Sequence, residues 1–378
     1  MNKVKLGDVA DVKLSNVDKK TKPNELEVRL CNYTDVYKNW SIKNDMAGSF
    51  MIATCNENEL EKFILKKGQV AITKDSETPD DIGVSAYIAE EFDAVVLGYH
   101  LALITPFSEK LNGRFLNYYF HTKHLQAYFE NNAGGSGQRW SLSIDIIKKI
   151  PLFLPGLHTQ SAIADVLSSL DDKIDLNNKI NKELEDLVKT IYDYWFVQNA
   201  DEKWERKKIG EIAEVIRGSM ITEKQTKEGN IKVVAGGVDY SYCHSKFNRE
   251  KNTITVSGSG ANAGFVNFWR EEIFASDCTT VRGKSDFSTM LIYHHLKLHQ
   301  ENIFRSAKGS AQPHVYPSDI KDIWYFEIPK RMEEKFSPLF ISINEQIAKN
   351  QLEATSLARL RDWLLPMMMN GQVSVKDS

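Results

Sequence analysis

Residues 4–13 read VKLGDVADVK and residues 207–216 read KKIGEIAEVI, so the opening motif of the chain recurs near its middle. Apolar residues, a glycine and an acidic residue occupy the same places in both copies. The matched pairs are Leu6/Ile209, Gly7/Gly210, Asp8/Glu211, Val9/Ile212 and Ala10/Ala213. An internal repeat of this kind indicates that the chain is built from two copies of one structural unit.

A second match lies further along both copies. Residues 137–155 read GQRWSLSIDIIKKIPLFLP, and residues 311–329 read AQPHVYPSDIKDIWYFEIP. The identical positions are Gln138/Gln312, Asp145/Asp319, Ile146/Ile320 and Pro155/Pro329. The stretch between the two motifs is longer in the first copy, and insertions of this kind belong in surface loops, where two copies with different tasks would differ.

A helical stretch follows each closing proline. Apolar residues recur there at steps of three and four, which is the pattern of a coiled coil. The contact positions that this pattern predicts are Ile163, Leu167, Leu170, Ile174, Asn177, Leu184, Val188 and Ile191 in the first helix, and Phe336, Phe340, Ile343, Ile347, Asn350, Leu357 and Leu364 in the second. Asn177 and Asn350 fall at matching places, and a polar residue among such contacts can fix register.

Each helix should be roughly 55–60 Å long, and two such helices can pair antiparallel. The alternative is a pair of amphipathic helices that pack separately on globular cores. We favour the coiled coil because both helices carry the same pattern with the same polar interruption. Pro366 predicts the end of the second helix.

The segments before the two helices mix short β-like runs with shorter helices, which predicts a mixed α/β domain in each copy. In the first copy, β-like runs fall within residues 63–73, 83–90 and 93–106, followed by a helix over 113–130 and a glycine-rich loop over 131–141. In the second copy, the corresponding ranges are 231–240, 252–268, 272–281, 288–304 and 305–316. We therefore divide the chain into globular domains at 1–155 and 201–330, a central helix at 156–200, and a C-terminal helix and tail at 331–378.

Composition sets the broad class. The chain has 378 residues, of which 42% are hydrophobic and 26% charged, as in an ordinary globular protein of two or three domains. No apolar run of about 18 residues predicts a membrane span, and the N-terminus lacks a signal-peptide pattern, so we expect a cytoplasmic protein with no membrane partner. The scattered cysteines Cys31, Cys55, Cys243 and Cys278 form no CxxC pair and should be reduced thiols.

The net charge of -3 argues against a nucleic-acid binder that acts alone, because such proteins usually carry a basic excess. It permits DNA binding through local basic grooves, or inside a complex whose other subunits contact the phosphates.

Motifs for catalysis are missing. Residues 257–264 read SGSGANAG, but Ala263 occupies the place of the third glycine in GxGxxG, and no Walker motif occurs. His295 and His299 are spaced as in HExxH without its glutamate, so we expect His294, His295 and His299 to be packed or polar-face residues. The Asn/Asp-Pro-Pro-aromatic motif of adenine methyltransferases and the GxSxG motif are also absent. We predict no catalytic residue and no metal site.

Polar loops at matching places in the two copies are suited to reading DNA. Glutamine can pair with adenine and arginine with guanine in the major groove, whereas serine and lysine suit phosphates. The residues that we predict to contact DNA are Ser136, Gln138, Arg139 and Trp140 in the first glycine-rich loop, Lys308, Ser310, Gln312 and His314 in the second, and Lys74, Ser76, Ser257, Ser259 and Asn262 in two loops that follow upstream strands. The alternative for these loops is a flexible polar surface without a ligand.

The chain resembles the specificity subunits of type I restriction-modification systems over essentially its whole length. The resemblance is carried by LGDVADV (6–12) and IGEIAEV (209–215), TVSGSGANAGFVNFW (255–269), FASDCTTV (274–281), GSGQRWSLSIDI (135–146), GSAQPHVYPSDI (309–320), LEDLVKTIYDYWFVQ (184–198) and LARLRDWLLPMMMNGQV (357–373). The second copy matches more plainly than the first, in which residues 20–95 carry no motif.

The resemblance implies two target-recognition domains, each reading one half of an asymmetric site in double-stranded DNA. The helices would form a spacer and dock two methyltransferase subunits, which modify adenine with S-adenosylmethionine. Restriction/translocase subunits would cleave unmethylated DNA with ATP and Mg. The chain itself would bind no cofactor and perform no catalysis. The alternative function is a coiled-coil scaffold with two protein-binding domains, and dependence on DNA separates the two.

Overall fold

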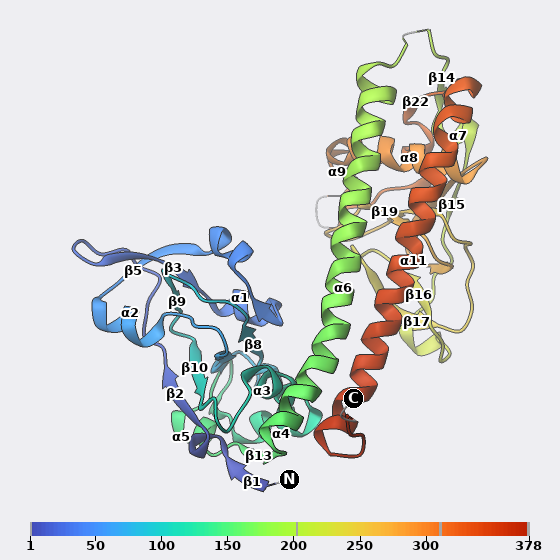
Figure 1. Cartoon of the computed structure of the whole chain (residues 1–378). Coiled ribbons are helices and arrows are strands. Elements are labelled where there is room, and N and C mark those ends of the chain that lie inside the picture. Colours follow the sequence, from blue (N-terminus) through green and yellow to red (C-terminus); the bar gives the residue numbers. More distant parts are fainter. Residues whose placement is uncertain (1, 202, 310–311, 376–378) are drawn as a thin grey trace. The chain divides into compact units, whose positions relative to one another are not determined.

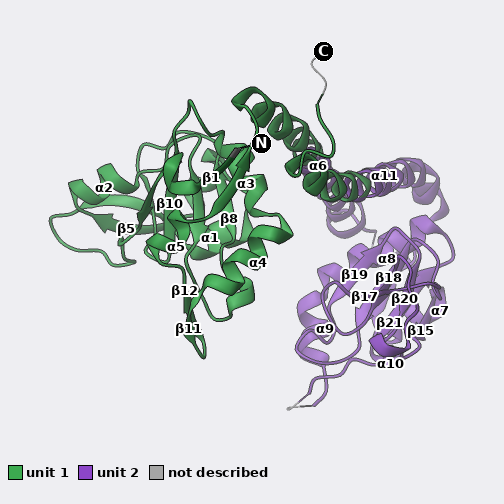
Figure 2. Ribbon diagram, turned by 90° about the horizontal axis from the view of Figure 1, so that it is seen from below, with its two compact units in different colours: residues 1–173, 356–378 green, residues 174–355 purple. Residues whose placement is uncertain are grey.

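The computed structural model describes residues 2–201, 203–309 and 312–375, and it divides the chain into two compact units (Figures 1 and 2). Unit 1 comprises Met1–Lys173 and Ser356–Ser378, and unit 2 comprises Ile174–Thr355. The chain passes from one unit to the other within each of its two long helices, so each unit contains a segment of both helices.

Unit 1 is built on a five-stranded sheet of order β2-β10-β6-β8-β4. Its central strands are short apolar runs such as VAIT and SAYI, and all their residues are buried, as expected of strands covered on both faces. The strands are β2 (Ala10–Leu14), β4 (Ser41–Ile42), β6 (Val70–Thr73), β8 (Ser85–Ile88) and β10 (Leu101–Pro106).

Smaller sheets complete unit 1. One has the order β5-β3-β9, one pairs β1 with β13, and one has the order β11-β12-β7. Their bounds are β1 (Asn2–Lys5), β3 (Leu26–Cys31), β5 (Met51–Cys55), β7 (Asp75–Ser76), β9 (Val95–Leu97), β11 (Gly134–Ser136), β12 (Arg139–Ser141) and β13 (Pro151–Leu154). Residues 131–141, expected as a loop, therefore contain a β-hairpin.

The shorter helices of unit 1 are α1 (Tyr33–Lys38), α2 (Glu57–Phe63), α3 (Gly113–Phe120), α4 (Lys123–Asn132) and α5 (Ile144–Lys148). Two expectations are wrong here. The single helix over 113–130 is two helices, because Thr122 adopts an extended conformation and begins α4. The run 63–73 is strand only from Val70, because Phe63 is the last residue of α2 and residues 67–68 form a turn.

Unit 2 repeats the arrangement with a four-stranded sheet of order β15-β21-β18-β19, a three-stranded sheet of order β17-β16-β20, and the pair β14-β22. The strands are β14 (Arg206–Lys208), β15 (Ala213–Arg217), β16 (Ile231–Val234), β17 (Tyr240–His244), β18 (Thr253–Ser257), β19 (Val266–Trp269), β20 (Ile273–Ala275), β21 (Cys278–Gly283) and β22 (Trp324–Phe326). The helices are α7 (Ile209–Ile212), α8 (Asp286–Leu298), α9 (Gln300–Ser306) and α10 (Pro317–Lys321). The helix expected over 288–304 is thus also divided.

The larger sheets of unit 1 and unit 2 correspond strand by strand in chain order. Strands β2, β10, β6 and β8 of unit 1 match β15, β21, β18 and β19 of unit 2, and β5-β3-β9 matches β17-β16-β20. The parallel pairings β3/β9 and β16/β20 also correspond. The internal repeat read from the sequence is therefore a repeat of topology, and the expected mixed α/β fold is confirmed.

The long helices are α6 (Leu157–Tyr192), which continues as a π-helical turn over Asp193–Gln198, and α11 (Lys330–Met369). In unit 2 they pair antiparallel (Figure 1). Asn181 contacts Asn350, whereas Trp195 of the π-helical turn that follows α6 contacts Phe336, which lies earlier in α11. In unit 1, Arg361 of α11 forms an ion pair with Asp171 of α6 at 2.6 Å.

Pro366 does not end the second helix, which continues to Met369. Met368 and Met369 are buried in the core of unit 1 together with Leu6 and Leu167. Packing of this last turn therefore keeps the backbone helical beyond the proline. Among the described helices, none is long and apolar enough to cross a bilayer.

Candidate nucleic-acid interface

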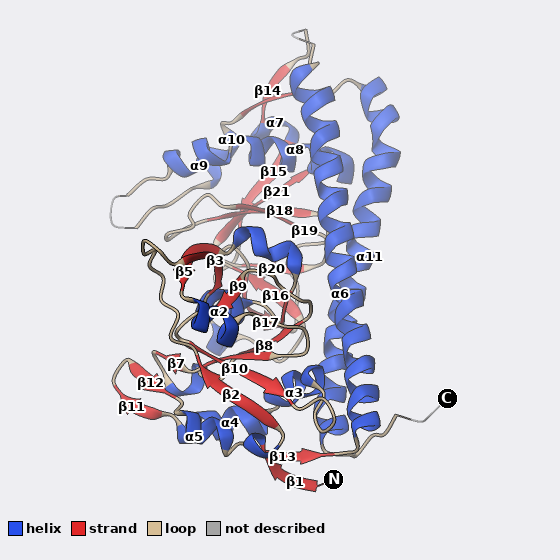
Figure 3. Cartoon of the chain, turned by 60° about the vertical axis from the view of Figure 1, so that its left-hand side comes forward, coloured by secondary structure: helices blue, strands red, loops and turns tan. Residues whose placement is uncertain are grey.

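The first glycine-rich loop is a hairpin that projects from the body of unit 1 (Figure 3). Ser136 pairs with Arg139, so Gly137 and Gln138 form a two-residue turn, and Gly137 has the positive φ of 63° that such turns require. Trp140 Nε1 donates a hydrogen bond to the Gly137 carbonyl at 3.0 Å, which fastens the turn to the strand behind it. Ser136, Gln138 and Arg139 are exposed at the tip.

The hairpin is joined to the upstream loop predicted to contact DNA. Strand β12 pairs antiparallel with β7, where Trp140 lies opposite Ser76 and Ser141 opposite Asp75. A cavity of about 880 Å³ opens beside this junction, and its walls include Tyr33, Ser76, Gln138 and Arg139. Four of the residues predicted for unit 1, namely Ser76, Gln138, Arg139 and Trp140, therefore line one cavity.

Lys74, which is predicted to contact DNA, makes a contact within unit 1. Its ammonium group forms an ion pair with Asp75 at 2.6 Å, and its side chain is only 17% exposed. Tyr37 also lines the cavity. It donates a hydrogen bond to Asp81 at 2.9 Å, and this bond raises the pKa of the phenol. The acidic residues of the cavity are thus partly engaged with neighbours inside unit 1.

The second glycine-rich loop has a related geometry. Lys308 and His314 exchange backbone hydrogen bonds of 2.9 and 2.8 Å, so the loop returns on itself, and His314 also forms a β-bridge with Ser259. Gln312 is exposed, whereas the ammonium group of Lys308 pairs with Asp319 at 2.9 Å. The hydrogen bond with Asp319 raises the pKa of Lys308. Ser310 lies outside the described residues.

The upstream loop of unit 2 separates its three predicted residues. Ser257 is 4% exposed and donates to the Gly237 carbonyl at 2.8 Å, so its hydroxyl faces the interior. Ser259 donates to Asp277, and Asn262 is exposed at the turn. Glycines with positive φ at Gly260 and Gly264 shape this turn.

The predicted contact positions of the helices lie as follows. Within unit 2, the buried ones are Asn177, Val188, Phe336, Phe340, Ile343, Ile347 and Asn350, and the half-buried ones are Ile174, Leu184 and Ile191. Within unit 1, Ile163 and Leu167 are buried, and Leu170, Leu357 and Leu364 are half-buried. Asn181 falls on the next step of the same pattern after Asn177, although it is not among the predicted contact positions. Its side chain is 7% exposed and accepts a hydrogen bond from Asn350 at 2.8 Å.

Sequence reasoning also missed four charged or titratable residues beside the loops. Asp75 and His100 meet in unit 1, and Arg217 and Asp277 meet in unit 2. No spacing signal could have found them, because each pair joins segments that are far apart in the chain. In the described part of the chain, no group of three His, Cys, Asp or Glu residues is placed to hold a metal.

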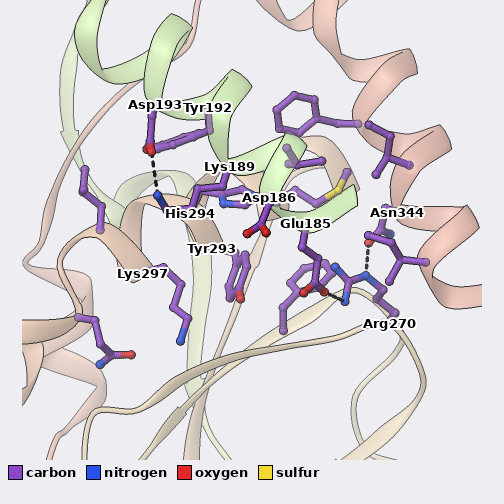
Figure 4. Close-up of a pocket in the computed structure, with 18 residues that line it drawn as sticks. Glu185, Asp186, Lys189, Tyr192, Asp193, Arg270, Tyr293, His294, Lys297 and Asn344 are labelled. Carbon is purple, nitrogen blue, oxygen red and sulfur yellow. Dashed lines mark hydrogen bonds and ion pairs between the residues drawn. The ribbon is translucent and has the colours of Figure 1, made fainter. Parts of the chain in front are cut away.

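A separate cavity of about 500 Å³ lies in unit 2, lined by residues of α6, α8 and α11 (Figure 4). His294 stacks on Tyr192 with ring centroids 5.3 Å apart, and burial lowers the pKa of the imidazole to about 4. Arg270 forms an ion pair with Glu185 at 3.0 Å and donates to Asn344 at 2.9 Å. These contacts connect the sheet of unit 2 to both long helices.

Comparison with known proteins follows the same division into two copies. The family model described as "Type I restriction modification DNA specificity domain" matches residues 1–186 and again residues 201–353. The chain is 25% identical over 301 residues to the type I restriction enzyme MjaIX specificity subunit of Methanocaldococcus jannaschii, a match that covers 70% of this chain and 69% of the relative. It is 22% identical over 282 residues to a putative type I specificity subunit of Mycoplasma genitalium, covering 68% and 73% of the two chains.

A solved structure is similar over the full length. The crystal structure of the type I restriction-modification system S subunit from M. genitalium superposes with a TM-score of 0.61 at 18% sequence identity, covering 100% of this chain and 96% of that chain. This likeness concerns the fold.

Proposed function

Because the chain belongs to the type I restriction-modification DNA specificity family, we propose that unit 1 and unit 2 each read one half of a bipartite site in double-stranded DNA. The observation that carries this proposal is the repeated loop junction. In unit 1, Trp140 of the glycine-rich hairpin pairs with Ser76, and in unit 2, His314 of the corresponding loop pairs with Ser259. Both units thus present a pair of joined polar loops from the same place in the fold, with different side chains.

The hairpin of unit 1 has a shape that DNA can accept, since the major groove admits a two-stranded β-ribbon. Gln138 and Arg139 at the exposed tip are the side chains that we assign to base edges, adenine and guanine being their usual partners. In unit 2, exposed Gln312 takes the corresponding role, beside His314. Ser136 and Asn262 suit phosphates. The Ser257 hydroxyl faces the interior, and the ammonium groups of Lys74 and Lys308 are paired with Asp75 and Asp319.

Chemistry on the DNA would be supplied by other subunits. A specificity subunit recognises sequence and is not itself the catalyst. We assign adenine methylation with S-adenosylmethionine to two methyltransferase subunits, and cleavage with ATP and Mg to restriction/translocase subunits, all acting in the cytoplasm. The net charge of -3 supports this division, because a chain without a basic excess needs partners to help neutralise phosphates.

The long helices would act as a spacer. Most of their contact positions are apolar, and the buried asparagines Asn177, Asn181 and Asn350 interrupt this apolar series. Polar residues in such positions can specify one register of the helix pair. A fixed register would give a fixed distance between the two recognition units, and hence a fixed gap of unread base pairs.

The test is co-expression of the chain with its methyltransferase, followed by single-molecule mapping of adenine methylation. We expect one bipartite motif. Arg139→Ala should relax only one half of it and Gln312→Ala only the other, because each unit reads its own half. Each loss should be about 1–3 kcal/mol of discrimination. A methylome without any sequence preference would overturn the proposal, and the alternative of a protein-binding scaffold predicts that result.

A further inference from the structure

In unit 1, Asp75 contacts both the recognition hairpin and the main sheet. The backbone of Asp75 pairs with Ser141 of the hairpin strand β12. Its side chain makes separate contacts: Asp75 Oδ2 accepts a hydrogen bond from His100 Nδ1 at 2.9 Å and another from Lys74 Nζ at 2.6 Å. His100 stands in the turn that precedes β10, the neighbour of β6 in the sheet. Asp75 therefore links the loop that reads to the sheet that supports it.

Unit 2 has a link of the same kind with other side chains. The backbone of Ser259 bridges to His314 in the second glycine-rich loop. The Ser259 hydroxyl donates to Asp277 Oδ2, and Asp277 Oδ1 accepts from the Arg217 guanidinium at 3.2 Å. Asp277 stands in the turn that precedes β21, the neighbour of β18.

Strand register shows that the two links occupy equivalent positions. Leu101 lies opposite Thr73 in unit 1, and Cys278 lies opposite Ser257 in unit 2. Asp75 and Ser259 each stand two residues beyond the strand residue of that pair. His100 and Asp277 each stand one residue before its partner. The two copies therefore keep a side-chain link at one place in the fold, built once from a carboxylate and an imidazole and once from a hydroxyl and a carboxylate.

We propose that Asp75–His100 and Ser259–Asp277 are loop-anchoring pairs, that is, positioning residues that hold each recognition loop at a fixed angle to its sheet while it reads DNA. The inference rests on the proposed function. The side chains of both pairs are partly exposed, at 29% for Asp75, 38% for His100 and 17% for Asp277. Such contacts add little to global stability, but they fix the segment that carries the reading side chains.

The carboxylate of each pair, Asp75 or Asp277, also binds a cation. Lys74 binds Asp75, and Arg217 binds Asp277. A carboxylate beside DNA phosphates would be repelled, and the bound cation removes that cost. This arrangement explains why Lys74 is turned inward, although its place in the loop suggested a phosphate contact.

The experiment uses the full chain co-expressed with its methyltransferase. His100→Ala should relax the half-site that Arg139→Ala relaxes, and Asp277→Ala the half-site that Gln312→Ala relaxes, each by about tenfold in discrimination, with the other half unchanged. His100→Asn should restore specificity, because its amide can donate to Asp75. Asp277→Asn should restore it only partly, because the amide oxygen accepts from Ser259 but the charge that binds Arg217 is lost. His124→Ala, which removes an exposed histidine of α4, is the matched control.

The outcomes are distinguishable. A wild-type methylome without a motif overturns the proposed function itself. A wild-type motif that His100→Ala and Asp277→Ala leave intact overturns the loop-anchoring pairs alone. A variant that lowers methylation at all sites equally, together with its melting temperature, shows a merely structural residue and also overturns the inference. Loss confined to one half-site at an unchanged melting temperature supports it.

Discussion

Replacing the buried asparagine pair of the helices gives the sharpest test of how the helices are held together. Asn350 Nδ2 donates to Asn181 Oδ1 at 2.8 Å, and Gln346 Nε2 donates to Asn350 Oδ1 at 2.7 Å. Asn181 and Asn350 are 7% and 5% exposed, so water cannot replace a lost partner. Asn350→Leu therefore leaves Asn181 Oδ1 buried without a donor, and Asn181→Leu leaves Asn350 Nδ2 without an acceptor.

Each single change should lower the free energy of unfolding by about 1–3 kcal/mol, the cost of an unsatisfied buried polar group. The double variant Asn181→Leu/Asn350→Leu removes donor and acceptor together and adds apolar contact with Ile347. We expect it to be close to the wild type or more stable. The coupling between the two positions in a double-mutant cycle would then equal the sum of the two single losses, about 2–6 kcal/mol.

The assay is urea unfolding followed by circular dichroism on all four proteins, with melting temperatures as a second measurement. Methylation mapping of the double variant adds a functional readout, because loss of the polar pair should let the helices slip and broaden the gap length. If the double variant loses as much stability as the two single variants combined, the asparagines act independently and the reasoning is refuted.

Three further predictions concern stability, pH and geometry. Gly83→Ala should destabilise unit 1 by about 2–4 kcal/mol, because Gly83 has φ +83° and an added Cβ would lie 2.3 Å from the Phe129 ring. The control Gly68→Ala, with φ +92° and open space around the added Cβ, should cost only about 1–2 kcal/mol of backbone strain. Equal losses of stability for the two variants in thermal unfolding would contradict the clash with Phe129. The stability of unit 2 should fall as pH drops from about 6.5 to about 4, because folding lowers the pKa of His294 to about 4 and the unfolded chain therefore binds the proton first. His294→Phe should reduce the pH dependence of the free energy of unfolding, measured in urea, by up to about 1.4 kcal/mol per pH unit. An unchanged pH dependence would show that His294 is not the titrating group. Insertion of four residues after Asn177, matched by four in α11, should lengthen the helix pair by about 6 Å. The unread gap in the DNA site should then widen by nearly two base pairs, with both half-sites unchanged. Altered half-sites in the methylation map would rule out a spacer role for the helices.

The repeat and the long helices could be predicted because their signals are local. Leu6 and Ile209 open matching motifs, and the steps from Ile163 to Leu167 and from Phe336 to Phe340 follow helical periodicity whatever the rest of the chain does. By contrast, the sheet β5-β3-β9 lies in residues 20–95, where no motif was found. It is held by the parallel pairing of β3 with β9, which joins strands more than sixty residues apart and leaves no pattern in either strand alone.

The candidate interface could be predicted only in part, because some of its signals are local and others depend on long-range strand pairing. Gln138 and Arg139 stand out beside glycines, but glycine has low β propensity, so the hairpin itself was expected to be a loop. It forms because β12 pairs with β7, which is distant in the sequence. The inward turn of Lys74 and the link between Asp75 and His100 depend on that same long-range pairing, and only the folded chain shows them.

The division of the long helices between the two units has a consequence for biosynthesis. Unit 2 is one continuous segment, Ile174–Thr355, so all of its core has been made before residue 356 is added. Unit 1 begins first but needs Met368 and Met369 to fill its core. At about 5–20 residues per second, its N-terminal part waits roughly 10–40 s on the ribosome for those residues. The half of the protein that is translated first is therefore the half that finishes folding last, and its apolar surface is the one that chaperones would have to cover.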